Sequence, residues 1–178
     1  RGGAFIYLWA DPNFGGWTDP IFSPCAQNSG SPDRVVLNIA TDSYDRDVAW
    51  WVQNIGNAIA TTRSKYPNLR QIVLMPVFGG PADSLCTSNN RLVASVRVVR
   101  PSFTHPFIDQ AIAQLVGGDV IAGPSPEARS CADYLDTIGH PTETAQGPWG
   151  QMIGEYFAFG TPPSVPAPAV TFPARIDV

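Results

Sequence analysis

Arg34-Val-Val-Leu-Asn-Ile-Ala40 and Gln71-Ile-Val-Leu-Met-Pro-Val77 are two short apolar runs that, with the chain between them, decide the fold. Each run is bounded by turn residues, which is typical of a strand buried on both faces of a sheet. Between the runs, apolar residues recur at helical spacing from Val48 to Thr62, and Tyr66-Pro67 predicts the end of that helix. A strand, a helix and a strand in this order predict a parallel unit.

The same alternation continues downstream of this unit. Asp119–Ala122 is expected to be a third parallel strand, and the last helix is expected to begin with Pro141 and to run through Trp149 to Phe157. We predict an α/β fold, a three-layer sandwich with a central, mostly parallel sheet, over residues 1–160, followed by a proline-rich tail at 161–178. Two further elements complete the prediction: a short strand or hairpin arm at Leu92–Val99, and a helix through Ile108, Ala111, Ile112 and Leu115.

The composition narrows the class of protein. Charged residues make up only 15% of the 178 residues and the formal net charge is -4, so no basic patch favours nucleic acid. No apolar run approaches the roughly 20 residues that a membrane span needs. Few charges, 18 prolines, 16 glycines and five tryptophans favour a secreted protein. The tryptophans are expected in the core or at its rim rather than as a carbohydrate platform.

Three cysteines agree with an extracellular location. Cys86 and Cys131 each lie in a polar stretch and are expected to form a disulfide, as in oxidising compartments. Cys25 is then left over, either as a free thiol or with a partner upstream. No Cys-x-x-Cys or His/Cys cluster predicts a metal site.

An acid and a histidine stand close together before the last helix, in Asp136-Thr-Ile-Gly-His140. An imidazole whose tautomer is fixed by a carboxylate can take a proton from a hydroxyl nucleophile. Ligands of open parallel sheets bind beyond the carboxyl ends of the strands, where we also expect Ala40–Ser43 and Val77–Gly80. A histidine that only caps a helix or packs is the structural alternative.

Taken in order, these segments resemble the SGNH (GDSL) hydrolases over about residues 2–158. The run Val35-Val-Leu-Asn-Ile-Ala-Thr-Asp-Ser43, followed by a long helix and a strand, is similar to the family's strand with its Gly-x-Asn-Asp-like loop. Asp136…His140-Pro-Thr-Glu resembles its closing Asp-x-x-His-Pro motif, and Gly2-Gly3 resembles the glycine after its second strand.

The resemblance implies a carboxylic ester hydrolase that needs no metal or cofactor. His140 would be the general base, Asp136 the acid that orients it, and Gly2 or Gly3 a donor to the oxyanion hole, with Asp42 and Ser43 lining the site. The substrate would be a small-molecule or polysaccharide ester. The family's nucleophilic serine would lie on a strand upstream of Arg1, so we expect residues 1–178 alone to be inactive. An N-terminal segment or a neighbouring chain would then complete the sheet.

Three departures from the family's pattern stand beside this resemblance, and two of them, the absent serine and Asp42, favour a second hypothesis, a catalytically inactive SGNH-like protein that serves secreted binding or assembly. No Gly-Asp-Ser motif occurs, and Asp136 precedes His140 by four positions where three is usual. Asp42 stands where the family has an asparagine, and a carboxylate cannot donate a hydrogen bond unless protonated. Losing one oxyanion donor costs about 2.7–4 kcal/mol of transition-state stabilisation. Asp133 is an alternative partner for His140, and Ser43 an alternative nucleophile.

Overall fold

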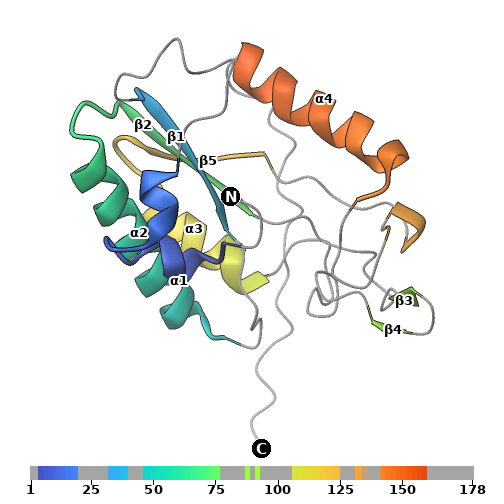
Figure 1. Ribbon diagram of the computed structural model, residues 1–178, viewed down its shortest axis with the longest axis horizontal. Helices are drawn as coiled ribbons and strands as arrows, with labels where there is room; N and C mark the ends of the chain where they lie inside the picture. Colours follow the sequence, from blue (N-terminus) through green and yellow to red (C-terminus); the bar gives the residue numbers. More distant parts are fainter. Residues whose placement is uncertain are drawn as a thin grey trace, which may run out of the picture.

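A computed structural model describes residues 4–19, 32–39, 46–76, 87–88, 91–92, 106–124, 131–133, 135 and 141–159. Its centre is a three-stranded parallel sheet, ordered β1-β2-β5 (Figure 1). The strands are β1 (Arg34–Ile39), β2 (Gln71–Pro76) and β5 (Val120–Ala122). Both pairings are parallel, which confirms the three predicted strands and their direction.

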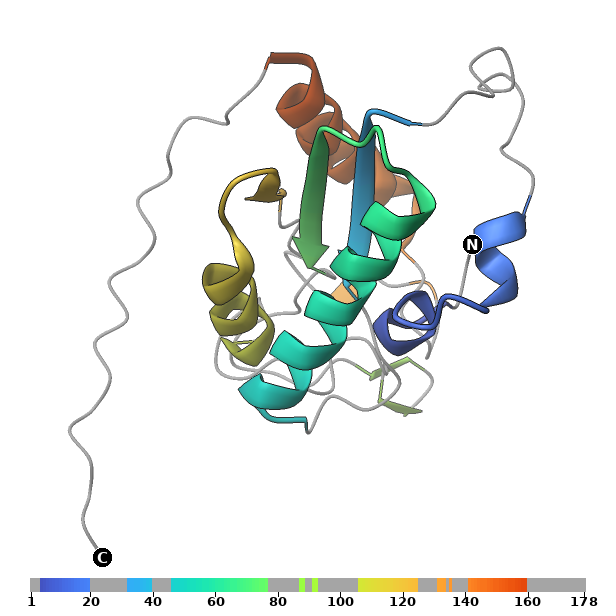
Figure 2. The same ribbon diagram turned by 90° about the vertical axis from the view of Figure 1, so that its left-hand side faces the viewer.

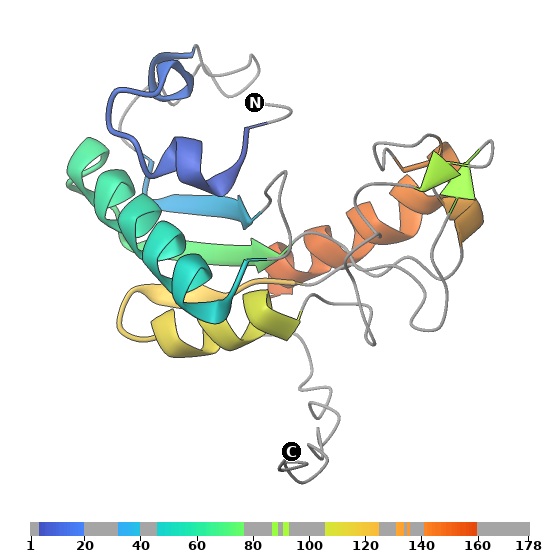
Figure 3. The ribbon, with the colours of Figure 1, turned by 90° about the horizontal axis from the view of Figure 1, so that it is seen from below.

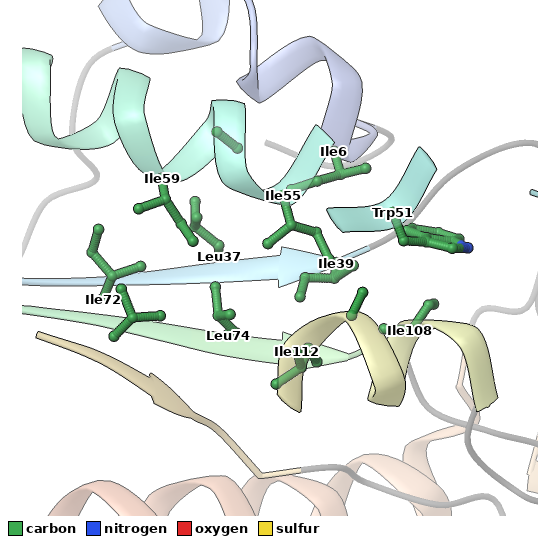
Figure 4. Close-up of a cluster of buried hydrophobic side chains, with 13 residues drawn as sticks. Ile6, Leu37, Ile39, Trp51, Ile55, Ile59, Ile72, Leu74, Ile108 and Ile112 are labelled. Carbon is green, nitrogen blue, oxygen red and sulfur yellow. The ribbon is translucent and has the colours of Figure 1, made fainter. Parts of the chain in front are cut away.

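Three helices cover one face of the sheet: α1 (Ile6–Trp9), α2 (Val48–Lys65) and α3 (Pro106–Leu115). The apolar side chains that the sequence places at helical spacing point inward. The main core lies between α2, α3 and the sheet (Figure 4). A helix of this kind is held chiefly by such tertiary packing of its apolar face. The buried cluster consists of Ile6, Leu37, Ile39, Trp51, Ile55, Ala58, Ile59, Ile72, Leu74, Ile108, Ala111, Ile112 and Val120.

One helix, α4 (Glu143–Phe159), lies on the opposite face of the sheet (Figure 2). Side chains alternate along a strand, so Val73 points away from the face that holds Ile72 and Leu74, and it is also fully buried. The Arg34 guanidinium lies over the Phe157 ring, 5.6 Å from its centroid. Helices on both faces of a parallel sheet make the predicted three-layer α/β arrangement.

Short elements complete the described chain. They include two 3-10 helices, η1 (Gly15–Thr18) and η3 (Cys131–Asp133), and a small antiparallel hairpin of β3 (Thr87–Ser88) and β4 (Arg91–Leu92). The hairpin meets the predicted arm at Leu92 only, because residues 93–99 lie outside the described part of the chain.

The helix α1 was not predicted, since four residues are too few for a periodic signal. This short helix is stabilised by aromatic packing instead of by many helical turns. Trp9 packs edge-to-face with Phe14 and Trp17, at ring-centroid distances of 5.0 and 4.9 Å. The Thr61 hydroxyl donates to the Ala10 carbonyl at 3.0 Å and ties this segment to α2.

An ion pair joins the last turn of α2 to the start of β5. Arg63 Nε donates to Asp119 Oδ2 at 3.1 Å, and a second guanidinium nitrogen contacts Oδ1. The hydrogen bond from Arg63 lowers the pKa of the Asp119 carboxyl. Both side chains are partly exposed, so the pair contributes little to stability and mainly fixes the turn before β5.

Among the helices that the structure describes, none is both long and apolar enough to cross a bilayer.

Replacing a buried side chain of the central strand tests this core. Leu74→Ala removes a fully buried side chain and should lower the free energy of unfolding by about 2–5 kcal/mol, measured by urea denaturation. Val36→Ala on β1 is the matched control, because Val36 is 40% exposed and its truncation should cost far less. Equal losses for the two variants would contradict this assignment of the core.

Candidate active site at the carboxyl edge of the sheet

The three strands end at one edge of the sheet, here called the carboxyl edge. Ile39 lies opposite Pro76 in the register, so the segments that follow β1 and β2 leave the sheet at neighbouring positions. Strand β5 ends earlier, with Ala122 opposite Leu74. Figure 3 shows α2 and α3 beginning on this side, as crossover helices of a parallel sheet must.

The exit from β5 is fixed by a close approach of two backbones. The Gly123 N–H donates to the Leu74 carbonyl at 2.7 Å. A Cβ at Gly123 would lie 2.7 Å from Val73 Cγ1 and 3.1 Å from the Leu74 oxygen, so only glycine fits without a shift. Pro76, two residues further along β2, has no N–H with which to extend this ladder.

The beginning of α4 also lies on the carboxyl side, beyond the strand ends and near the β3–β4 hairpin (Figure 3). Thr142 caps the helix, because its hydroxyl accepts from the Ala145 N–H at 3.3 Å. The Thr142 N–H in turn donates to the Asp133 carbonyl at 2.8 Å. The prediction that Pro141 is the first helical residue was wrong, since Thr142 takes the capping position and the helix starts at Glu143.

A single tyrosine hydroxyl fixes the other end of α4 to the sheet. Tyr156 donates to the Ala122 carbonyl at 2.7 Å, at the last residue of β5. Burial raises the pKa of the Tyr156 phenol, and the positive charge of Arg34 partly opposes that rise. Trp149 is buried as predicted, whereas Met152 is 42% exposed and lies outside the packed stripe of α4.

The first turn of α2 adds an aromatic group to the same side. Asp47 caps the helix by accepting from the Trp50 N–H at 2.8 Å, and the Arg46 guanidinium lies 5.3 Å from the Trp50 ring centroid. Trp51 is fully buried and meets Trp50 edge-on, with the ring centroids 5.1 Å apart. Arg46 was not among the predicted site residues, although a cation four residues before a tryptophan at a helix start is a usable signal of such a contact.

The predicted catalytic and site-lining residues lie outside the described residues. This holds for His140, Asp136, Asp42, Ser43, Gly2 and Gly3. Their described flanks are Ile39 and Arg46 around residues 40–45, and Leu135 and Pro141 around residues 136–140. Both pairs of flanks border the carboxyl side, and the contacts of His140 with Asp136 stay a prediction.

Two further predictions fall partly within the described chain. Asp133, the alternative partner for His140, lies in η3 and uses its main-chain carbonyl to hold Thr142. Cys131 begins the same short helix, while Cys86 and Cys25 lie outside the described residues, so the disulfide also stays a prediction.

Within the described part of the chain, no group of three or more histidine, cysteine, aspartate or glutamate residues could hold a metal ion. Comparisons of the chain with protein-family models, with curated proteins and with solved structures found no match.

Removing the tyrosine hydroxyl tests how α4 is held. Tyr156→Phe should lower the free energy of unfolding by about 0.5–1.5 kcal/mol, because the Ala122 carbonyl loses its donor. Phe159→Ala is the control on the same helix, since Phe159 is 85% exposed and its truncation should change stability by no more than about 0.5 kcal/mol. A Tyr156→Phe protein as stable as the wild type would contradict the anchoring role.

Tyr156→Phe should also change the phenol titration of the protein at alkaline pH. The raised pKa of Tyr156 means that its contribution to stability is complete below the ordinary tyrosine pKa, about 10, and is lost as the pH rises through the folded-state pKa. Absorbance titration of the phenols should therefore lose, in Tyr156→Phe, one component that ionises above the ordinary tyrosine range.

Proposed function

We propose that this chain forms the histidine/aspartate part of an SGNH-type carboxylic ester hydrolase. The observation that supports the proposal most is that two of the candidate segments border the side of the sheet toward which the strands point. The segment containing Asp42 and Ser43 follows β1 there, and Asp136 and His140 precede α4, whose capped start lies on the same side of the sheet. Parallel sheets use this edge for ligands.

In the proposed reaction, the Oγ of a serine attacks the ester carbonyl carbon while His140 takes the serine proton. Asp136 holds the imidazole in the required tautomer and stabilises its cation. The N–H groups of Gly2 or Gly3 donate to the oxyanion of the tetrahedral intermediate, which collapses as His140 protonates the leaving alcohol. Water then attacks the acyl-serine by the same proton route and releases the carboxylic acid.

No serine of residues 1–178 lies in a sequence that resembles the family's nucleophile motif. We propose that it lies on a strand upstream of Arg1, in an N-terminal segment or a neighbouring chain that completes the sheet. No step of this chemistry requires a metal or a cofactor. The substrate class is a small-molecule or polysaccharide carboxylic ester.

A secreted, catalytically inactive SGNH-like binding or assembly protein is the second candidate. Two features of the sequence favour it: Asp42 in the place of the oxyanion-hole asparagine, and the lack of a Gly-Asp-Ser motif. A carboxylate at that position would repel the oxyanion rather than stabilise it. The upstream sequence separates the two candidates, since only the esterase needs a Gly-x-Ser strand.

Serine labelling of the native protein tests the esterase. The protein isolated without reduction should contain a Gly-x-Ser segment that a fluorophosphonate labels, as shown by intact mass and peptide sequencing. His140→Ala should lower ester hydrolysis, measured with p-nitrophenyl butyrate, by about 10⁴-fold or more, because the serine loses its base. His105→Ala, the only other histidine of the chain, should leave the rate unchanged.

Two results would overturn the esterase. One is a native protein that consists of residues 1–178 alone and is not labelled, which would favour the binding protein. The other is an equal loss of activity in His105→Ala and His140→Ala.

A disulfide between Cys86 and Cys131 would support the secreted location that we propose for this protein. Non-reducing peptide mapping should find the two cysteines in one cross-linked pair, and reduction should lower the urea midpoint because the cross-link limits the unfolded chain. Recovery of Cys86 as a free thiol from protein kept unreduced would contradict both the disulfide and the oxidising compartment.

A further inference from the structure

Helix α4 contains several residues that weaken a helix from within. It is 17 residues long and includes Gly147, Gly150 and Gly154 together with Pro148. Glycine and proline are the least favourable residues in the interior of a helix. Pro148 also has no N–H with which to bond the carbonyl of Thr144, four residues before it. Helix α2, which is 18 residues long, contains one glycine and no proline.

The packing of α4 is also smaller than that of α2. Two residues of α4, Ala145 and Trp149, are buried, whereas α2 buries six. Most of the stability of a helix in a protein comes from the packing of its apolar face. Helix α4 therefore has both the weaker backbone and the weaker packing of the two.

Polar contacts hold the two ends of α4. At its start, the Thr142 N–H donates to the carbonyl of Asp133 in η3 at 2.8 Å. In its last turns, the Tyr156 hydroxyl donates to the Ala122 carbonyl at 2.7 Å, and the Phe157 ring lies against a guanidinium of β1. These contacts are few and directional, so they can break and reform without repacking an apolar interior.

The main core is built without α4. Its described members come from α1, α2, α3 and the three strands, and none of them lies on α4. Helix α4 covers the other face of the sheet, toward which Val73 points (Figure 2). Proteins open in cooperative units, and the units that open first are those with few buried apolar contacts. Helix α4 has the features of such a unit.

We infer that α4 is a lid, which opens as one unit from the second face of the sheet while the core of α2, α3 and the sheet stays folded. This inference concerns α4 and holds whether or not the protein is an esterase. One consequence rests on the proposed function. Asp136 and His140 directly precede α4, so an open lid would carry them away from the carboxyl edge, and the closed lid would be the active state.

Two matched variants test the lid by amide hydrogen exchange of the folded protein. Gly150→Ala lies on α4, where a Cβ would meet no atom within 4 Å. Gly56→Ala lies on α2, where a Cβ would be 3.8 Å from Leu115 Cδ2, an ordinary contact. Each methyl group fits and should stabilise its own helix. Exchange is measured at the amides inside both helices, at several urea concentrations below the unfolding transition.

The expected result separates the two helices. In the wild type, the amides of α4 should exchange about tenfold or more faster than those of α2, relative to the intrinsic rate of each amide. They should also share one opening free energy that falls with urea, because opening exposes surface.

The variants should then differ in a defined way. Gly56→Ala should slow the α2 amides about two- to fivefold and leave the α4 amides unchanged, because α2 stays folded when the lid opens. Gly150→Ala should slow the amides of both helices by a similar factor, because α4 is also unfolded when the whole molecule unfolds.

Either of two observations would overturn the inference. If Gly56→Ala slows both helices equally, α4 opens only when the whole molecule unfolds. If each α4 amide exchanges at its own rate, with no dependence on urea, the helix frays turn by turn and is not a lid. Neither observation depends on ester hydrolysis, so the inference and the proposed function can fail separately.

Discussion

The parallel pairing of β2 with a strand on each side is the constraint on which the rest of the described structure depends. Parallel strands cannot be joined by a tight turn, so each connection must cross the sheet, and here α2 and α3 make the two crossings. The six-residue register between β1 and β2 brings the exits of both strands to one edge of the sheet. The core then follows, because two crossover helices on one face place their apolar sides against the same strands.

On the opposite face of the sheet, α4 is held by far fewer contacts than α2 and α3 are on the first face. Helix α4 reaches the sheet through Trp149, the Tyr156 hydroxyl and the stacking of Phe157 on Arg34. A hydrogen bond from a half-buried phenol to a strand end is directional, whereas apolar packing is not. The orientation of α4, and with it the position of the Thr142 cap, therefore depends on a polar contact at one end and a buried indole near the other.

The sequence predicts the sheet and its main helices well, and the physical reason is burial. Apolar runs and apolar spacing predict which faces of a strand or helix are buried, and the fold does bury them. Examples are Gln71–Pro76 and the spacing of Trp51, Ile55 and Ile59. The short helix α1 could not be found in this way, because its stability comes from contacts among Trp9, Phe14 and Trp17 rather than from periodicity. The helix start at Glu143 was missed by two residues, since both Pro141 and Thr142 are good helix-start residues and only the hydroxyl contact decides between them. The candidate site was predicted from a resemblance of motifs, and the described structure bears on its flanks alone.

Pro76 affects the carboxyl edge of the sheet through its backbone, because proline has no N–H. Along β2, Ile72 and Leu74 bond toward β5, and Pro76 is the next residue whose amide would face that way. Its ring removes the donor at this point, so the ladder between β2 and β5 lacks one hydrogen bond after the contact of Gly123 with Leu74. The missing ladder bond is thus built into the covalent structure of one residue, and it would persist in a relative that exchanged every neighbouring side chain but kept the pyrrolidine ring.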